Sequence, residues 1–325
     1  MKPAFSVIFL TTLIGAAQGL FLALFTVQAY AAFKLLPTPD AHGFYGQGSL
    51  LALGLLAAGL FASFFHLGHP ERAWRSAARW RTSWLSREVI VLPAFMGVVS
   101  LYGLVHWLGW QPVLMTLPGE LQVDPGVILG VAGTVLAFAL FLCTAMIYAC
   151  LRFLGEWHSP LTVINYVLLG GASGFTLATA LASLTAPELV GFLGGWAAII
   201  TVLGLLGRSA SLYRNAHLKH KSTLQTAIGI KHPKLVQKAQ GFMGGSFNTR
   251  EFFHGQPVAV LRGVKWFFLI AAFPLPVLLL SFGMKGGVAA LAAAFIVQYA
   301  GLLAERWFFF AQANHPQNLY YQSIA

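Results

Sequence analysis

The sequence has 325 residues, of which 58% are hydrophobic and only 9% are charged, with a formal net charge of +11. Ordinary soluble domains carry about 25% charged residues, so this composition excludes a soluble globular protein and indicates an integral membrane protein. A positive charge on such a protein reports first on its topology, and nucleic-acid binding is a poor interpretation of it.

Eight apolar runs are long enough to cross a hydrocarbon core about 30 Å thick, which takes roughly 20 residues of helix. In chain order they cover residues 4–33, 47–67, 89–110, 126–150, 161–184, 189–206, 264–283 and 287–310. None alternates with the period of a membrane-spanning strand. The first run is too long for the apolar core of a signal peptide, so we expect it to be retained. We therefore predict a single all-α membrane domain over residues 1–325, with eight transmembrane helices in two four-helix bundles.

Lysine and arginine are divided unequally between the two sides of the predicted membrane. One set of alternate connections carries nearly all of them, whereas the opposite set contains only Lys34 and Lys285. The positive-inside rule therefore predicts that both termini are cytoplasmic. In the fifth run, Gly170 and Gly174 form a small-xxx-small face, which predicts a close contact between two helices.

One connection, residues 209–263, is much longer than the others. It is basic, with Glu251 as its single acidic residue, yet apolar and aromatic residues are spread through it. A connection of this length in a compact domain is usually functional or disordered, and a solvated tail would contain fewer aromatic residues. We expect an ordered cytoplasmic platform on which a protein partner docks; the alternative is a flexible segment that contacts lipid.

Several redox and energy-coupling chemistries have no residues to support them in this chain. Cys143 and Cys150 lie on one predicted helix, about 10 Å apart along its axis, and cannot hold an iron–sulfur cluster. His66 and His106 lie near opposite membrane faces, which disfavours a transmembrane haem. No phosphate-binding GxxxxGK[ST] loop and no HExxH zinc motif occurs. We expect no metal in this chain, so redox metals would belong to partner subunits.

The connection after the second run, FHLGHPERAWRSAARWRTSWLSREV, concentrates five arginines and two glutamates in residues 65–89. Taken singly, Glu88 could serve the start of a helix, His66 could be an interfacial histidine, and the arginines could only set topology. Together, His66, Arg72, Arg87 and Glu88 offer proton carriers beside cations, and ionisable groups near membrane depth usually mark function. This combination fits the headgroup of a quinone, which takes up protons with its electrons.

The same residues carry a resemblance to a known family. HLGHPERAW followed by SWLSREV resembles the HLGSPxRA and LSxE elements of the polytopic anchor subunits of molybdenum enzymes of the dimethyl-sulfoxide-reductase type. The resemblance covers nearly the whole chain, including RFLGEWHSPLTVINY, and it implies quinone-site roles for His66, Arg72 and Glu88. It also implies two partners, a ferredoxin-like iron–sulfur subunit and a molybdopterin catalytic subunit. His69 departs from the family pattern, which has serine there.

Two features separate this chain from the sulfoxide reductase anchors. The long basic connection resembles a loop in the membrane subunits of cytoplasmic sulfite dehydrogenases, and the opening MKPAFSVIFLTTLIGAAQGLFLAL is similar to theirs. The arginine-rich HLG/LSxE face is predicted to be cytoplasmic, whereas sulfoxide reductases of this type commonly carry their catalytic subunits outside. The resemblance therefore implies an anchor in the bacterial cytoplasmic membrane that passes electrons from sulfite oxidation to ubiquinone or menaquinone.

We interpret His66 and Glu88 as quinone ligands and proton carriers, with Arg72 and Arg87 orienting the headgroup or Glu88. Further candidates for the site are His69, Tyr148, Trp157 and Glu305. Glu305 could also pair with Arg306, although adjacent residues on a helix do not face each other. Two alternatives remain open: a quinol-oxidising anchor of a dimethyl-sulfoxide or polysulfide reductase, and a transporter or structural anchor without a quinone site.

Overall fold

The computed structural model describes residues 3–118, 121–219, 223–236, 238 and 257–315. Within them, eight helical spans are long and apolar enough to cross a membrane, which confirms the predicted number. The spans are α1 (Phe5–Ala32), α2 (Gln47–Ser63) with the short helices η1 (Ala41–Gly46) and η2 (Phe64–His66), α3 (Trp84–Trp107), α4 (Pro125–Ala149), α5 (Pro160–Thr185), η4 (Pro187–Leu189) with α6 (Val190–Ala216), α9 (Val258–Ala271) with α10 (Pro274–Gly283), and α11 (Val288–Ala311).

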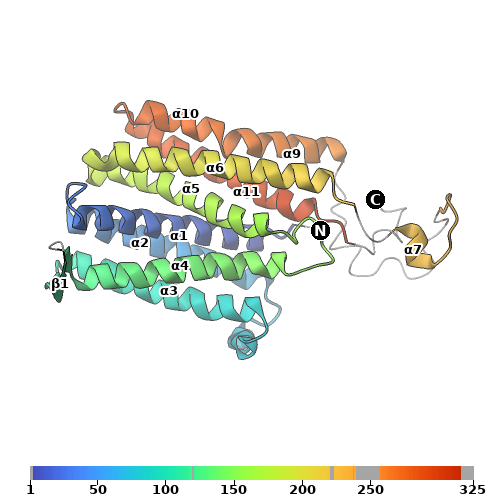
Figure 1. Ribbon diagram of the computed structural model, residues 1–325, viewed down its shortest axis with the longest axis horizontal. Coiled ribbons are helices and arrows are strands. Elements are labelled where there is room, and N and C mark those ends of the chain that lie inside the picture. Colours follow the sequence, from blue (N-terminus) through green and yellow to red (C-terminus); the bar gives the residue numbers. More distant parts are fainter. Residues whose placement is uncertain (1–2, 119–120, 220–222, 237, 239–256, 316–325) are drawn as a thin grey trace.

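The long helices lie side by side and end at two opposite faces of the molecule (Figure 1). α1 begins and α11 ends at one face, which we call the terminal end, and the short helix α7 (Leu224–Ile228) extends beyond it. A two-stranded antiparallel hairpin, β1 (Met115–Leu117) with β2 (Leu121–Val123), lies at the opposite face, the hairpin end.

α1 and α5 form the centre of the helical array. α1 packs against α2, α4, α5 and α11, and α5 packs in addition against α4, α6 and α11. α2, α3 and α4 lie on one side of this central pair, whereas α6, α9 and α10 lie on the other (Figure 1). Because α1 and α5 pack extensively on each other across the middle, the division into two four-helix bundles stays a prediction.

Glycine permits the close contact between α1 and α5. A Cβ atom on Gly174 would lie 2.0 Å from the backbone carbon of Gly19, and one on Gly19 would lie 2.1 Å from the carbonyl oxygen of Gly170. Backbones this close leave no room for a side chain, so the close contact predicted for Gly170 and Gly174 is confirmed.

Side-chain caps set where three of the helices begin. The Ser83 hydroxyl accepts a hydrogen bond from the Ser86 backbone N–H at 3.3 Å, and the Asp124 carboxylate accepts one from Val127 at 2.9 Å. Ser159 caps α5 in the same way. Such caps satisfy N–H groups that have no partner within the helix. Because Ser83 caps α3, Glu88 lies inside that helix and does not serve as its cap.

The sixth and seventh spans extend further toward the terminal end than the sequence predicts. α6 continues to Ala216 and α9 begins at Val258, so residues 209–216 and 258–263 of the predicted 209–263 connection are helical. Between the two helices the structure describes 217–219, 223–236, 238 and 257, including α7. The other residues of this connection, Glu251 among them, lie outside the described part of the chain.

The seventh span is interrupted between α9 and α10, at Ala272 and Phe273. Gln298 on α11 donates a hydrogen bond from Nε2 to the Ala272 carbonyl oxygen at 3.3 Å. A Cβ atom on Gly301 would lie 2.4 Å from the Ala272 backbone nitrogen, so glycine is needed there. α11 therefore supports the interruption, as a broken helix within a membrane requires.

Candidate functional site

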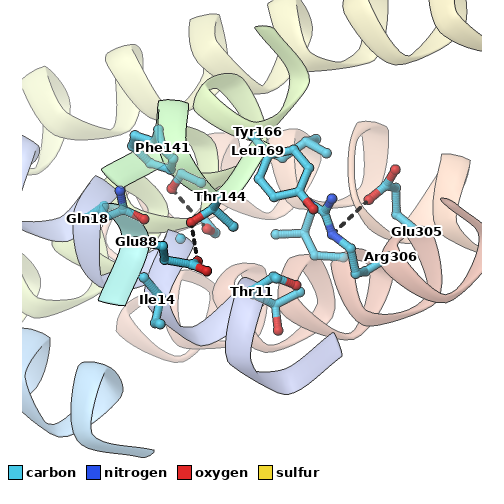
Figure 2. Close-up of a pocket in the computed structure, with 15 residues that line it drawn as sticks. Thr11, Ile14, Gln18, Glu88, Phe141, Thr144, Tyr166, Leu169, Glu305 and Arg306 are labelled. Carbon is cyan, nitrogen blue, oxygen red and sulfur yellow. Dashed lines mark hydrogen bonds and ion pairs between the residues drawn. The ribbon is translucent and has the colours of Figure 1, made fainter. Parts of the chain in front are cut away.

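A polar cavity lies where α1 and α5 meet α3, α4 and α11 (Figure 2). Its volume is about 20 Å³, which is enough for a water molecule and too small for a ring-shaped headgroup. Its polar lining comes from five helices, and consists of Thr11, Thr12, Gln18, Glu88, Thr144, Tyr166, Ser173, Glu305 and Arg306.

Glu88 is the acidic group that α3 contributes to this cavity. Its side chain is buried, with the residue 7% exposed, and the Thr144 hydroxyl of α4 donates a hydrogen bond to its Oε1 at 2.5 Å. Gln18 of α1 lines the same space and donates from Nε2 to the Ala137 carbonyl oxygen at 2.7 Å. A carboxyl group held by a hydroxyl at the wall of a small cavity can accept and release a proton.

Glu305 lines the cavity from α11, opposite Glu88 (Figure 2). Its carboxylate pairs with Arg208 of α6, with 2.7 Å between Oε1 and the arginine Nε, and both side chains are at most 3% exposed. The neighbouring Arg306 is a more distant partner, at 4.0 Å from Oε2, and its guanidinium lies 3.8 Å from the centre of the Tyr166 ring. The main partner of Glu305 is therefore Arg208, and not the adjacent Arg306 that the sequence suggested.

We call Arg208, Glu305 and Arg306 the charge cluster. A second small cavity, of about 10 Å³, adjoins it and is lined by Arg208, Ser211, Asn165 and Tyr166 among others. The Tyr166 hydroxyl and Arg208 Nη2 have no hydrogen-bond partner within the described residues. Burying such groups is costly unless something pairs with them. They can therefore bind a small polar molecule between α5, α6 and α11.

Tyr148 and Trp157 lie beside the charge cluster but do not line the Glu88 cavity. The Tyr148 ring contacts those of Trp157, Phe309 and Phe310 at 5.3 to 5.6 Å between centroids. The Trp157 indole N–H donates to the Phe309 carbonyl oxygen at 2.9 Å. Both residues belong to an aromatic cluster that packs the terminal end of α11.

The other predicted site residues lie at the surface of the terminal end. His66 is exposed at the end of η2. His69 and Arg72 approach Glu71 at 3.1 and 3.7 Å, with all three side chains largely exposed. None of these residues lines the Glu88 cavity.

Arg87 makes two hydrogen bonds with the backbone of the preceding connection. It donates from Nε to the Trp80 carbonyl oxygen at 2.9 Å and from Nη2 to that of Arg81 at 2.8 Å. Its guanidinium also lies 4.2 Å from the centre of the Trp84 ring. Arg87 therefore holds the connection onto α3, and of the residues predicted for the site only Glu88 and Glu305 line the cavity.

Sequence reasoning missed Arg208, Thr144, Gln18 and Tyr166. Arg208 lies between the predicted sixth run, which ends at residue 206, and the long connection at 209–263, so neither pattern assigns it a place inside the membrane. A polar residue inside an apolar run is a usable signal, because such a residue usually faces the interior of the helix bundle and forms a hydrogen bond or ion pair there. Gln18 and Thr144 carry that signal, whereas the partner each of them meets does not follow from it.

A larger pocket, of about 710 Å³, lies at the hairpin end. The buried His106 lines it from α3, together with Gln28, Tyr45 and Asp124. His106 Nδ1 donates to the Tyr102 carbonyl oxygen at 2.9 Å, so in the neutral ring Nε2 is an acceptor. By helix rise this pocket is about 27 Å from Glu88 along α3, and fully buried Phe21, Phe95 and Val99 lie between them.

Comparison with known proteins identifies relatives over the full length. Residues 1–313 match the family described as the DMSO reductase anchor subunit. The chain is also 60% identical over 326 residues to a sulfite dehydrogenase subunit of Allochromatium vinosum, and the alignment covers 100% of both proteins.

Proposed function

The chain belongs to the family of DMSO reductase anchor subunits, and from this premise we propose that it anchors a molybdenum and iron–sulfur sulfite dehydrogenase and reduces quinone. In this proposal a molybdopterin subunit oxidises sulfite in the cytoplasm. A ferredoxin-like iron–sulfur subunit carries the electrons to the terminal end of this multi-pass membrane protein. The name of the Allochromatium vinosum relative supports the substrate.

The buried Glu88, held by Thr144 at the wall of a polar cavity, is the observation that carries the quinone role. Reduction of a quinone to a quinol takes up one proton for each electron. Glu88 would hold and release a proton in the cavity between the helices. The exposed His66 at the same end would exchange protons with water. Arg72 would donate a hydrogen bond to an oxygen of the headgroup.

The polar groups of the site suit a quinone, but the cavity is too small to hold one. The cavity is lined by two carboxyl groups, several hydroxyls and a guanidinium, which are suitable partners for a ring bearing two oxygen atoms. Its volume of about 20 Å³ does not accommodate the ring. Binding there therefore requires the lining side chains of α1, α3 and α11 to separate, and the cavity of an inhibitor-bound form should be wider.

The distribution of charge supports a cytoplasmic terminal end in the bacterial inner membrane. The exposed arginines of residues 72–81 lie at this end, whereas the hairpin end has Lys34 and Lys285. The positive-inside rule assigns the arginine-rich end, and both termini with it, to the cytoplasm. The partner subunits would dock there, on the platform formed by the 209–263 connection.

Glu88→Gln tests the proposed proton carrier. We expect sulfite oxidation with a soluble artificial electron acceptor to be unchanged, while quinone reduction falls by about 100-fold or more, as expected for loss of a general acid. Glu71→Gln is the matched control, since it removes an exposed carboxylate from the same end of the protein. Unchanged quinone turnover in Glu88→Gln would remove the support for this role.

Deletion of residues 219–238 tests the docking platform. The iron–sulfur subunit should then leave the membrane fraction, whereas this chain stays inserted. A variant with Lys219, Lys231 and Lys234 changed to glutamine separates the contribution of charge from that of the segment itself. Retention of the partner at the wild-type level after the deletion would contradict docking on this connection.

A second candidate function follows from the family description, which names a reductase anchor. In that role the chain would oxidise quinol and pass electrons to a dimethyl-sulfoxide or polysulfide reductase. The location of the catalytic subunit decides between the two. Protease digestion of right-side-out and inverted membrane vesicles will place it outside for the reductase and inside for the sulfite dehydrogenase.

A further inference from the structure

A short helix lies beside the array of long helices and not among them. We call η3 (Pro70–Arg79), in the connection between α2 and α3, the lateral helix. It is seen along its axis beside the terminal end of α3, whereas the long helices are seen from the side, so it runs across them and not along them (Figure 1). If the long helices cross a membrane, the lateral helix lies along the membrane surface.

The lateral helix has one half-buried face and one exposed face. It packs against α3, and its half-buried residues are the small Ala73, Ser76 and Ala77. Its exposed residues are Glu71, Arg72, Trp74, Arg75, Ala78 and Arg79, with Glu71 as the single acid among them. Small residues on one face allow a close approach to α3, and large amphipathic residues cover the remaining surface.

Large aromatic side chains are exposed along the same connection. Trp74 is 71% exposed, Phe65 is 73% exposed, and Trp80 is 53% exposed. The Arg75 guanidinium lies 5.5 Å from the Trp74 ring centre, and that of Arg81 lies 5.4 Å from Trp80. Alternating tryptophan and arginine is typical of the membrane–water interface, where the ring enters the acyl boundary and the cation remains at the phosphates.

The position of the lateral helix is fixed by Arg87. Its two hydrogen bonds to the Trp80 and Arg81 carbonyl oxygens tie the end of the connection to the first turn of α3. Carbonyl groups at the end of a helix bind cations readily, so an arginine suits this position. The exposed arginines are thereby presented from a supported helix.

We propose that the lateral helix binds the phosphate groups of anionic phospholipids in the leaflet at the terminal end, with Arg72, Arg75 and Arg79 as the cationic ligands. The occupant is lipid and not a partner subunit because the helix lies beside the array, at the level of α3, whereas a subunit docked on the terminal end would lie beyond the helix ends. The four arginines of residues 70–81 outnumber the one glutamate, which complements an anionic surface. Arg72 is shared with the proposed quinone role, whereas Arg75 and Arg79 are not, so this inference does not depend on that role.

The test uses the purified complete complex and lipids of defined composition. Native mass spectrometry measures the binding of phosphatidylglycerol and of zwitterionic phosphatidylcholine to the wild type and to Arg72→Gln/Arg75→Gln/Arg79→Gln. We expect wild-type preference for phosphatidylglycerol, and weakening of that binding by about fivefold for each arginine removed. The matched control, Lys219→Gln/Lys231→Gln/Lys234→Gln, removes the same charge from the long connection and should change binding less than twofold.

A second measurement locates the aromatic residue. Brominated phosphatidylglycerol quenches tryptophan fluorescence on contact. Trp74→Phe removes the fluorophore of the lateral helix, so a smaller fraction of the fluorescence should be quenched. The triple arginine variant keeps Trp74 but should also show less quenching, because it binds less of the brominated lipid. Equal binding of both lipids by the wild type, or undiminished phosphatidylglycerol binding by the triple variant, would overturn the proposal. Loss of the iron–sulfur subunit from a triple variant that still binds phosphatidylglycerol would overturn it in favour of a docking surface.

Discussion

Arginine occurs in two opposite environments in this protein. Arg72 in the connection before α3 is 59% exposed and pairs with a glutamate that is 63% exposed, whereas Arg208 in α6 is 2% exposed and pairs with an equally buried Glu305. The exposed group belongs to the sequence elements that resemble the family motif. The buried group lies in a segment that the sequence placed at the edge of a loop. The charges that stand out in the sequence are therefore exposed in the structure. The charges whose burial costs the most free energy are different residues.

The two groups differ in what their charges can do. Exposed ion pairs contribute about 0 to 1 kcal/mol, because water already solvates both partners. A buried pair is expensive to desolvate, and removing one partner leaves an uncompensated charge. Among the buried charged side chains of the described spans, Glu88 and Glu305 are acidic and Arg208 and Arg306 are basic, so two of each sign are present.

The largest expected effect comes from breaking the buried pair. Arg208→Leu leaves the Glu305 carboxylate without its 2.7 Å partner and should lower the free energy of unfolding by about 3 to 5 kcal/mol. Thermal unfolding in detergent, followed by circular dichroism, measures this. Arg208→Leu/Glu305→Leu removes both charges and should recover most of the loss. A single variant as stable as the wild type would mean that the pair contributes nothing.

A smaller effect is expected from Thr144, which contacts the proposed proton carrier Glu88. Thr144→Val keeps the shape of the side chain but removes the hydroxyl that donates to Glu88, at a cost of about 1 to 3 kcal/mol. Quinone turnover should therefore fall roughly tenfold, with artificial-acceptor activity unchanged. Thr134→Val is the control on the same helix, since its hydroxyl donates to the Gly130 carbonyl oxygen of that helix. Equal losses in both variants would show that Thr144 acts only through packing.

Arg87 is less exposed than Arg72 and less buried than Arg208, so its substitution tests an intermediate case. Arg87→Lys keeps the charge but cannot reach the Trp80 and Arg81 carbonyl oxygens with the same planar pair of donors. We expect faster hydrogen exchange in residues 70–83, corresponding to about 1 kcal/mol, and the same result for Arg87→Gln. If Arg87→Lys exchanged as slowly as the wild type while Arg87→Gln did not, charge and not geometry would be the function of this residue.

The smallest expected effect is on the exposed pair. Arg72→Ala should change the free energy of unfolding by less than about 0.5 kcal/mol, since the pair with Glu71 spans 3.7 Å in solvent. The same unfolding measurement as for Arg208→Leu tests this. If Arg72 contacts the quinone headgroup as proposed, the KM for quinone will rise without a loss of stability. A destabilisation above about 1 kcal/mol would place Arg72 among the structurally demanding charges.

The sequence by itself determined the membrane class, the number of helices that can span, the close contact at Gly170 and Gly174, and the candidate Glu88. These features are local. A run of about 20 apolar residues needs no partner to be recognised. A glycine pair spaced by one helical turn marks a packing face, and a carboxylate near membrane depth is costly wherever its helix packs.

The tertiary structure alone decided which groups meet. Thr144 reaches Glu88 only because α3 packs on α4, and Arg208 reaches Glu305 only because α6 continues past the predicted end of its apolar run beside α11. The two residues of each pair lie far apart along the chain, and no periodicity within one helix encodes which face of another helix it will meet. The same limit applies to the exposure of His66 and the position of Arg87, which depend on how the connection folds back onto α3.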